Sequence, residues 1–332
     1  MADLTISRRH LGALAAAAAL APFSGAQAQS TSFPQPGRPI RLLVGLAPGG
    51  SLDSQARVLA KRLTEMLGTQ VIVENKPGAS MMLSASEIMR AQPDGHALLY
   101  APSSLFAQNP HTLSSVPYDP FKDFTPITMA ARGPLVLTVH TSLPVHNARD
   151  LVVWAKANPG KLNFASFGTG TSSHIYALAF AKSAGIEVTH VPYKGTAEAT
   201  RDLLEGRVQA YFDAAPTAIQ NTATGRIRMV AVAAPKRMLN SPEVPTLNEQ
   251  GISGMDLTSW ICIVGPARMP ADLVARLNAL LAQALSATDV KEFYARGAWE
   301  AAPSSPAELA TEMHTAYDKW GAMIKQIGFE KQ

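Results

Sequence analysis

Residues 40–51, IRLLVGLAPGGS, and the segment Ser51–Leu67 that follows them decide the fold. Ile40–Leu46 is short and apolar, which predicts a buried strand. In Ser51–Leu67 the apolar residues recur at steps of four and three, which predicts a helix, and Gly68 supplies a stop signal. A strand that enters a helix through a glycine-containing turn is the opening unit of an α/β sheet.

The same alternation of strands and helices continues along the chain. Parallel strands joined by right-handed crossover helices are therefore expected. Further strands are predicted at Val71–Val73, Ala97–Tyr100, Ile127–Ala131, Leu135–His140, Leu162–Ser166, Val188–Val191, Val208–Phe212, Met229–Ala233 and Thr258–Val264. Helices are predicted before Pro93 and at Ser172–Ala184, Thr196–Leu204, Ala271–Leu285 and around Pro306–Ile324.

A second strand–turn–helix unit repeats the first one. Leu162–Ser166 runs into residues 167–173, FGTGTSS, and then into the helix at Ser172–Ala184. Both turns contain glycine and end in Ser or Thr, which cap helices. Two similar α/β lobes with a cleft between them are the expected architecture.

Composition supports two folded domains. The chain has 332 residues, 47% of them hydrophobic and 16% charged. A disordered chain would carry more charge and less apolar material. The net charge is +4, without a run of like charges typical of a nucleic-acid-binding tail. The single cysteine, Cys262, excludes an intramolecular disulfide and a Cys-rich zinc site.

The first residues have the layout of an export signal. Arg8 and Arg9 precede the apolar run Leu11–Ala21, and Ala26-Gln27-Ala28 offers a small-x-small cleavage site. The alternative is an ordinary amphipathic helix. The twin arginine favours the Tat route, and the run is too short for a membrane span. We therefore expect cleavage after Ala28 and a periplasmic product without membrane insertion, for which nucleic acid is not an expected partner.

The two glycine-containing turns have the chemistry of an anion site. A helix start presents free backbone N–H groups and the positive end of the helix dipole, and glycine lets a ligand approach closely. Ligands of open α/β sheets sit at the carboxyl ends of strands, where both turns lie. If the lobes face one another, two helix starts point into one cleft, which suits an anion with two carboxylates. The alternative is two plain capped turns.

Other chemistry has no local signature. The sequence lacks a phosphate-binding Gly-Lys-Ser/Thr loop, a complete dinucleotide fingerprint, a G-x-S-x-G elbow and an H-E-x-x-H motif. The eight histidines show no metal-ligand spacing, so neither a metal nor a cofactor is expected. A hydrolase built on Ser, His and Asp stays open as a rival, and it would turn over an ester or amide.

A series of short motifs runs in order through nearly the whole chain after the leader. They are residues 47–53 APGGSLD, 74–79 ENKPGA, 93–96 PDGH, 117–120 PYDP, 168–174 GTGTSSH, 191–195 VPYKG, 212–213 FD, 244–246 VPT and 259–260 SW. Together these motifs resemble the substrate-binding receptors of tripartite tricarboxylate transporters, the Bug-type proteins.

The resemblance implies a type II periplasmic-binding-protein fold, in which two α/β lobes are joined by a hinge crossed twice. It implies that residues 29–131 and 256–332 form lobe 1 and residues 132–255 lobe 2, after a leader at residues 1–28. It also implies a monomeric receptor, not an enzyme, that delivers a small carboxylate to a permease with a large and a small subunit. A subunit serving a sensor kinase is the other receptor interpretation.

The resemblance also implies which residues bind the ligand, and none is expected to be catalytic. Asp53 could orient a water or simply favour its helix start, and His174 could donate to a carboxylate or merely pack. Asp213 could contact the ligand or the hinge. The candidates are Pro48, Gly49, Gly50, Ser51, Asp53, Ser80, Met81, Gly168, Gly170, Thr171, Ser172, His174, Tyr193 and Asp213.

The chain departs from the family pattern after Pro77-Gly78-Ala79. Ser80-Met81-Met82-Leu83 stands where further glycines and an asparagine are usual. Methionine contacts aromatic faces favourably, so this segment predicts a partly apolar or aromatic ligand. The alternative is that Met81 and Met82 fill the core. Trp260 likewise could stack on a ligand or belong to the core.

Overall fold

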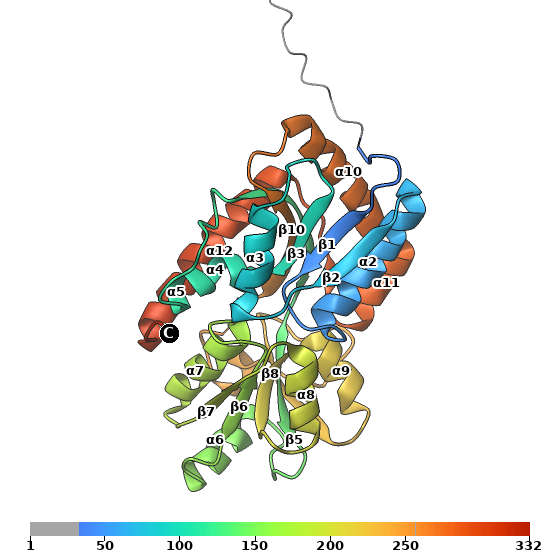
Figure 1. Cartoon of the computed structure of the whole chain (residues 1–332). Helices are drawn as coiled ribbons and strands as arrows, with labels where there is room; N and C mark the ends of the chain where they lie inside the picture. Colours follow the sequence, from blue (N-terminus) through green and yellow to red (C-terminus); the bar gives the residue numbers. More distant parts are fainter. Residues whose placement is uncertain (1–32, 256) are drawn as a thin grey trace, which may run out of the picture. The chain divides into compact units, whose positions relative to one another are not determined.

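The computed structural model describes residues 33–332 apart from residue 256, so the expected leader and its cleavage site lie outside the described residues. Two β-sheets organise this part of the chain (Figure 1). The first has the order β11-β4-β10-β3-β1-β2 and the second the order β7-β6-β8-β5-β9. This confirms the expected two-lobed α/β architecture.

The first sheet is mixed. β1 pairs in parallel with β2 and β3, while β10 is antiparallel to β3 and β4. The parallel pairs come from the strand–helix alternation predicted for this region. Its strands are β1 (Ile40–Val44), β2 (Val71–Asn75), β3 (Ala97–Pro102), β4 (Phe124–Gly133), β10 (Ser259–Pro266) and β11 (Glu300–Ala301).

The second sheet repeats this arrangement. β6 is parallel to β7 and β8, while β5 is antiparallel to β8 and β9. Its strands are β5 (Leu135–His140), β6 (Asn163–Ser166), β7 (Thr189–Pro192), β8 (Ala210–Ala214) and β9 (Ile227–Ala233).

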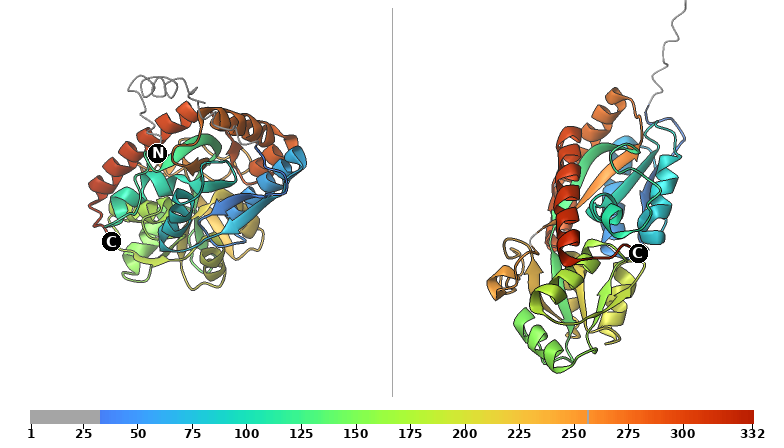
Figure 2. Two further views of the ribbon diagram at one scale, coloured as in Figure 1. Left: turned by 45° about the horizontal axis from the view of Figure 1, so that its top comes forward. Right: turned by 90° about the vertical axis from the view of Figure 1, so that its left-hand side faces the viewer.

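Helices cover both sheets (Figures 1 and 2). Around the first sheet lie α2 (Ser51–Leu67), the 3-10 turn η2 (Ala79–Met81), α3 (Met82–Met89), α4 (Ser103–Ala107), α5 (Asn109–Thr112), α10 (Ala271–Ser286), α11 (Thr288–Arg296) and α12 (Pro306–Ile327). The second sheet carries α6 (Ala148–Ala157), α7 (Ser172–Ala184), α8 (Thr196–Leu204) and α9 (Ala215–Thr222), and η3 (Asn248–Gln250) follows β9.

Local sequence explains α2 and α7. In α2 the apolar positions Leu52, Ala56, Leu59 and Leu63 are buried, and Gly68 ends the helix in the left-handed conformation at φ 62°. Helix α7 ends in the same way at Gly185. The bounds predicted for α2, α7 and α8 are confirmed. Helices α4, α5, α6, α9 and α11 were not predicted; α4 and α5 span only five and four residues, too few to show a helical period.

The chain crosses between the sheets twice. It leaves the first sheet at Gly133 and enters the second at Leu135, and it returns between Ala233 and Ser259. The first crossing is braced by Trp299, whose indole ring packs directly on the Gly133 backbone. The C-terminal helix α12 also contacts the second lobe, because Trp320 packs against Tyr176 with ring centroids 5.2 Å apart.

Candidate functional site

The Asp53 carboxylate fixes the conformation of the turn between β1 and α2. Gly49 lies in the left-handed region at φ 83°, and its N–H donates to Asp53 Oδ2 over 2.9 Å. Arg57 Nε donates to the same oxygen over 2.9 Å. Burial opposes the charged carboxyl, but the Arg57 and Gly49 hydrogen bonds prevail and lower the pKa of Asp53. Asp53 therefore fixes the turn from behind it.

A buried hydrogen-bond chain orients the Ser51 hydroxyl. Ser51 Oγ accepts from Gln55 Nε2 over 3.1 Å, and Gln55 Oε1 accepts from Tyr100 Oη over 3.2 Å. The Tyr100 and Tyr294 hydroxyls are 2.9 Å apart. Burial raises the pKa of both phenols above their usual range, so they remain neutral hydroxyls. Because Ser51 Oγ already accepts from Gln55, its own proton is left to donate to a ligand.

The turn between β6 and α7 is closed on itself. Thr171 Oγ1 donates to the Gly168 carbonyl over 2.7 Å, and the Gly170 N–H donates to His174 Nδ1 over 3.1 Å. Since Nδ1 accepts, the neutral His174 ring carries its proton on Nε2. Burial, and then the neighbouring His190, lower the pKa of His174 to about 3.

His190 stacks on His174 beneath this turn. The ring centroids lie 3.5 Å apart with an interplanar angle of 8°. His190 Nε2 is 2.7 Å from Ser166 Oγ, and burial lowers the pKa of His190 to about 4. Both rings are therefore neutral at neutral pH and act as packed supports of the turn.

Four hydrogen bonds join the two lobes around the two turns. The Ser51 N–H donates to Thr196 Oγ1 over 3.1 Å, and the Ala47 N–H donates to the Lys194 carbonyl over 3.3 Å. Further out, Ser80 Oγ donates to the Thr169 carbonyl over 2.9 Å, and Thr112 Oγ1 donates to the Gly170 carbonyl over 3.3 Å. The starts of α2, α7 and α8 thereby lie around one space.

That space is a cavity of about 40 Å³ between the two sheets. Its polar side chains come from the starts of α2, α7, α8 and β10. The interlobe hydrogen bonds hold its walls together. The residues that line it are Leu46, Ser51, Leu52, Pro102, Leu135, Phe167, Ser172, Thr196, Ala214, Ser259, Ile261 and Trp299.

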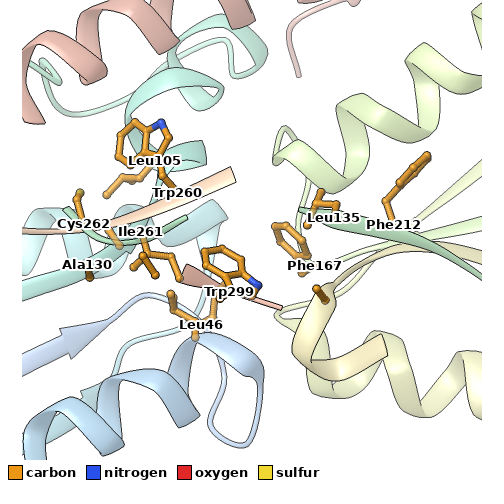
Figure 3. Packing of buried hydrophobic residues seen from close by; sticks show 14 of the residues in the cluster. Leu46, Leu105, Ala130, Leu135, Phe167, Phe212, Trp260, Ile261, Cys262 and Trp299 are labelled. Carbon is orange, nitrogen blue, oxygen red and sulfur yellow. The ribbon is translucent and has the colours of Figure 1, made fainter. Parts of the chain in front are cut away.

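Two aromatic side chains enter this cavity from opposite lobes. Figure 3 shows Phe167 on one side and Trp299 on the other, with Leu46 and Leu135 beside them. Trp299 and Ser259 are each 5% exposed. Within the described part of the chain, Trp299 Nε1 and Ser259 Oγ have no hydrogen-bond partner. Buried polar groups are normally paired, so these two atoms mark where a ligand acceptor fits.

Two further hollows flank the cavity. A groove of about 660 Å³ shares Ser51 with it and carries Gly49, Gly50, Arg201 and Arg296. A smaller pocket of about 290 Å³ lies on another side of the interlobe contact. It is lined by Gly45, Leu46, Gly78, Ser80, Met81, Phe167, Gly168, Thr169, Pro192, Tyr193 and Lys194.

The predicted site residues thus fall into separate groups. Ser51 and Ser172 line the central cavity, Gly49 and Gly50 line the groove, and the smaller pocket holds Ser80, Met81, Gly168 and Tyr193. Pro48 is exposed at the outer side of the first turn. The side chains of Thr171 and His174 bond to backbone groups of Gly168 and Gly170 in the second turn. Asp53 bonds to Gly49 in the first turn in the same way.

Three predicted side chains have partners within the protein. Asp213 is fully buried, accepts from Thr200 Oγ1 over 3.3 Å, and has its pKa raised by burial. Tyr193 Oη donates to Asp202 over 2.9 Å. Met81 is 1% exposed and lies so close to Gly45 that a Cβ there would be 2.8 Å from its Cβ and Cγ.

Sequence reasoning missed Phe167, Thr196, Ser259 and Trp299 as cavity residues. Phe167 and Ser259 stand inside quoted motifs, so their positions at strand ends were a usable signal. Trp299 gave no such signal, because it reaches the cavity only through the packing of α11 and β11 on β4. Trp260 belongs to the core, stacked on Phe106 with centroids 6.3 Å apart.

Among residues 33–332 without 256, no cluster of three or more His, Cys, Asp or Glu could hold a metal ion. In the same residues no helix is both long and apolar enough to span a bilayer.

The fold and this interlobe cavity define a two-lobed solute-binding protein, and comparison with known proteins gives its family. The model of the tripartite tricarboxylate transporter family receptor, TctC, matches residues 55–329. The chain belongs to this family of periplasmic solute-binding receptors.

Individual relatives agree with this assignment. A UPF0065 protein from the tcbD-tcbE intergenic region of Pseudomonas sp. strain P51 is 34% identical over 87% of this chain and 86% of its own length. The solved structure of an R. palustris protein with adipate has a TM-score of 0.86 and 31% identity over 90% of this chain and 99% of its own. The periplasmic binding protein BugD also has a TM-score of 0.86, with 30% identity over 90% of this chain and all of its own.

Proposed function

We propose that this chain captures a small carboxylate in the interlobe cavity and delivers it to a membrane permease with a large and a small subunit. The observation that carries the proposal is the meeting of three helix starts, α2, α7 and α8, around one enclosed space. Backbone N–H groups and the positive dipole ends of helices bind anions without a cationic side chain. The adipate bound by the R. palustris relative supports the same ligand class.

The cavity favours binding over catalysis. In the part of the chain that the structure describes, no histidine is hydrogen-bonded to the hydroxyls that line it, those of Ser51, Ser172, Thr196 and Ser259. The Ser–His pair of Ser166 and His190 lies under the second turn, with Ser166 fully buried and also bonded to Gly168. A Ser nucleophile needs an accessible oxygen and a base oriented by a third group. We therefore propose a receptor without hydrolase activity.

The site residues and the division into lobes belong to the same proposal. The Gly49–Ser51 turn and the Gly168–Ser172 turn place the starts of α2 and α7 at the ligand, and residues 132–255 move as the second lobe against residues 29–131 and 256–332. The protein acts as a periplasmic monomer after cleavage following Ala28. Arg201 and Arg296 at the mouth of the flanking groove favour the approach of an anion.

Calorimetry on the chain from residue 29 onward tests this proposal. Mono-, di- and tricarboxylic acids are titrated into the protein one at a time. The acid that binds is expected to do so with a stoichiometry of one molecule per chain. A ligand at a hundredfold excess over Kd stabilises the folded state by about 2.7 kcal/mol, so the melting temperature rises as well. The corresponding neutral amides are the control, and they are expected to leave the melting temperature unchanged. Absence of binding by every acid, or turnover of ester substrates, would contradict the proposal.

A further inference from the structure

The interlobe cavity is apolar along its middle and polar at two separate places. Ser51, Ser172 and Thr196 stand at the helix starts, while Ser259 and Trp299 stand beside the first crossing between the sheets. Ser259 pairs with Gly133 in the sheet, and the Trp299 ring packs on the same glycine. The remaining lining residues are Leu46, Leu52, Pro102, Leu135, Phe167, Ala214 and Ile261.

Trp299 is held in place by its own segment. Ala298, just before it, lies in the left-handed region at φ 54°, which is unusual for a residue other than glycine. The backbone N–H of Trp299 donates to the Tyr294 carbonyl over 3.0 Å. Figure 3 shows the indole nitrogen on the side of the ring that faces the second lobe. The indole is thus a fixed wall with a donor directed across the cavity.

Phe167 belongs to the opposite lobe and directly follows strand β6, at the start of the second turn. The cavity of about 40 Å³ is smaller than a ring-bearing acid, so such a ligand requires the lobes to lie further apart than they do here, with Phe167 and Trp299 on its two faces. An apolar body placed between the two rings loses contact with water on both faces, which is favourable in proportion to the area buried.

The two unpartnered donors specify the far end of the ligand. An indole N–H can only donate a hydrogen bond, and the Ser259 hydroxyl can also donate. A buried donor without a partner costs free energy, which a ligand acceptor would recover. The far end of the ligand is therefore an oxygen acceptor, and the near end is the carboxylate at the helix starts.

We propose that the ligand is a carboxylic acid with a ring-bearing apolar body and a second oxygen acceptor, with Phe167 and Trp299 as its specificity-determining residues. This inference rests on the proposed carboxylate receptor function and narrows its substrate class. It predicts poor binding of short acids that carry hydroxyl groups along their chain, because those hydroxyls would lose water against the apolar walls.

Calorimetry with four acids tests the class. Benzene-1,4-dicarboxylate is expected to bind at least tenfold more tightly than malate and citrate, and more tightly than benzoate, which lacks the second acceptor. Malate or citrate binding more tightly than the ring-bearing diacid overturns this inference and leaves the receptor function standing. If none of the four acids nor any other carboxylate binds, the receptor function itself fails.

Three variants separate the walls from the donor. Trp299→Phe keeps a ring and removes the N–H, so benzene-1,4-dicarboxylate should lose about tenfold in affinity while benzoate changes less than threefold. Ser259→Ala should act in the same direction. Phe167→Ala should weaken both aromatic acids at least tenfold. Equal losses for benzoate and the diacid in Trp299→Phe and Ser259→Ala would refute the donor role.

Trp154→Phe is the matched control, because it makes the same Trp-to-Phe substitution at a residue of α6 that does not line the cavity. It should leave all four affinities unchanged. Melting temperatures without ligand report whether each variant is folded. Ser259→Ala removes a single oxygen, so it keeps the donor test available if Trp299→Phe is destabilised.

Discussion

The two glycine-containing turns look alike in sequence and differ in what their bonds leave free. In the first turn, Asp53 holds Gly49 from behind and the Ser51 proton remains available. In the second, Thr171 and His174 bond to Gly168 and Gly170 within the turn itself, and the Gly170 carbonyl accepts from Thr112 of the other lobe. Both turns are thus braced by a side chain four residues after a glycine, and both bond to the opposite lobe. They differ in the groups that make the interlobe bonds: the first turn uses the N–H groups of Ala47 and Ser51, and the second uses the carbonyls of Thr169 and Gly170.

Gly170→Val, in the second turn, is expected to have the largest effect on ligand binding and stability. Gly170 lies at φ 75°, and a Cβ there would collide with Thr112 Oγ1. Left-handed strain in a branched residue costs of order 1–3 kcal/mol, and the collision keeps the lobes apart. Loss of ligand binding and a lower melting temperature are expected, measured by calorimetry and thermal unfolding.

Two glycine variants separate strain from collision. Gly160→Val has the same φ of 75° with open space around it, so it should lower stability and keep binding. Gly50→Val has an allowed φ of −84° but would collide with Thr196 Oγ1, so it should abolish binding with little loss of stability. Normal binding by Gly170→Val and Gly50→Val would show that both turns are structural only.

Asp53→Asn tests the support of the first turn. The substitution removes a charge that accepts from Gly49 and Arg57, and hydrogen bonds to charged groups contribute about 1.5–3 kcal/mol. Because the pKa of Asp53 is lowered by folding, its contribution is present above about pH 3.9 and is lost as the pH falls through the lower pKa of the folded state. Urea unfolding at pH 7 and pH 3 should show a large difference from wild type only at pH 7.

Thr196→Val tests the hydrogen bond by which the first turn contacts the second lobe. It removes the acceptor of the Ser51 N–H while keeping the side-chain volume. A net hydrogen bond is worth about 1 kcal/mol, which corresponds to roughly a fivefold weaker ligand affinity. Thr141→Val, at an exposed site of the second lobe, is the control. An affinity equal to that of wild type would mean that the bond does not stabilise the closed state.

His190→Phe probes the second turn with the smallest expected effect. His174 and His190 have pKa values lowered to about 3 and about 4, so the folded state keeps both neutral. The unfolded chain takes up protons near pH 6.5, and stability therefore falls as the pH drops from there toward the folded pKa values. The variant keeps a ring against His174 but loses the bond to Ser166, so it should be less stable by about 1 kcal/mol at pH 8 and should show a shallower acid dependence of the melting temperature. An unchanged slope between pH 4 and pH 6.5 would contradict this account.

Local sequence was enough to predict much of the fold. The bounds of α2, α7 and α8 follow from periodicity and from glycine stops, because these signals act within one or two helical turns. The pairing of the two glycine-containing turns followed from their position at strand ends. For Met81 two interpretations stood side by side, a ligand contact and a core position; it packs against Gly45 and lines the flanking pocket.

The sequence by itself determined the α/β alternation, the two-lobed plan and the helix starts that suit an anion. Only the tertiary structure decided that Phe167, Ser259 and Trp299 surround the same cavity as Ser51. Trp299 is 248 residues away from Ser51 in the sequence, and its neighbours there do not indicate which way its ring points. Its place follows from the packing of β11 on β4 and of the indole on Gly133, a contact between distant segments that no local pattern encodes.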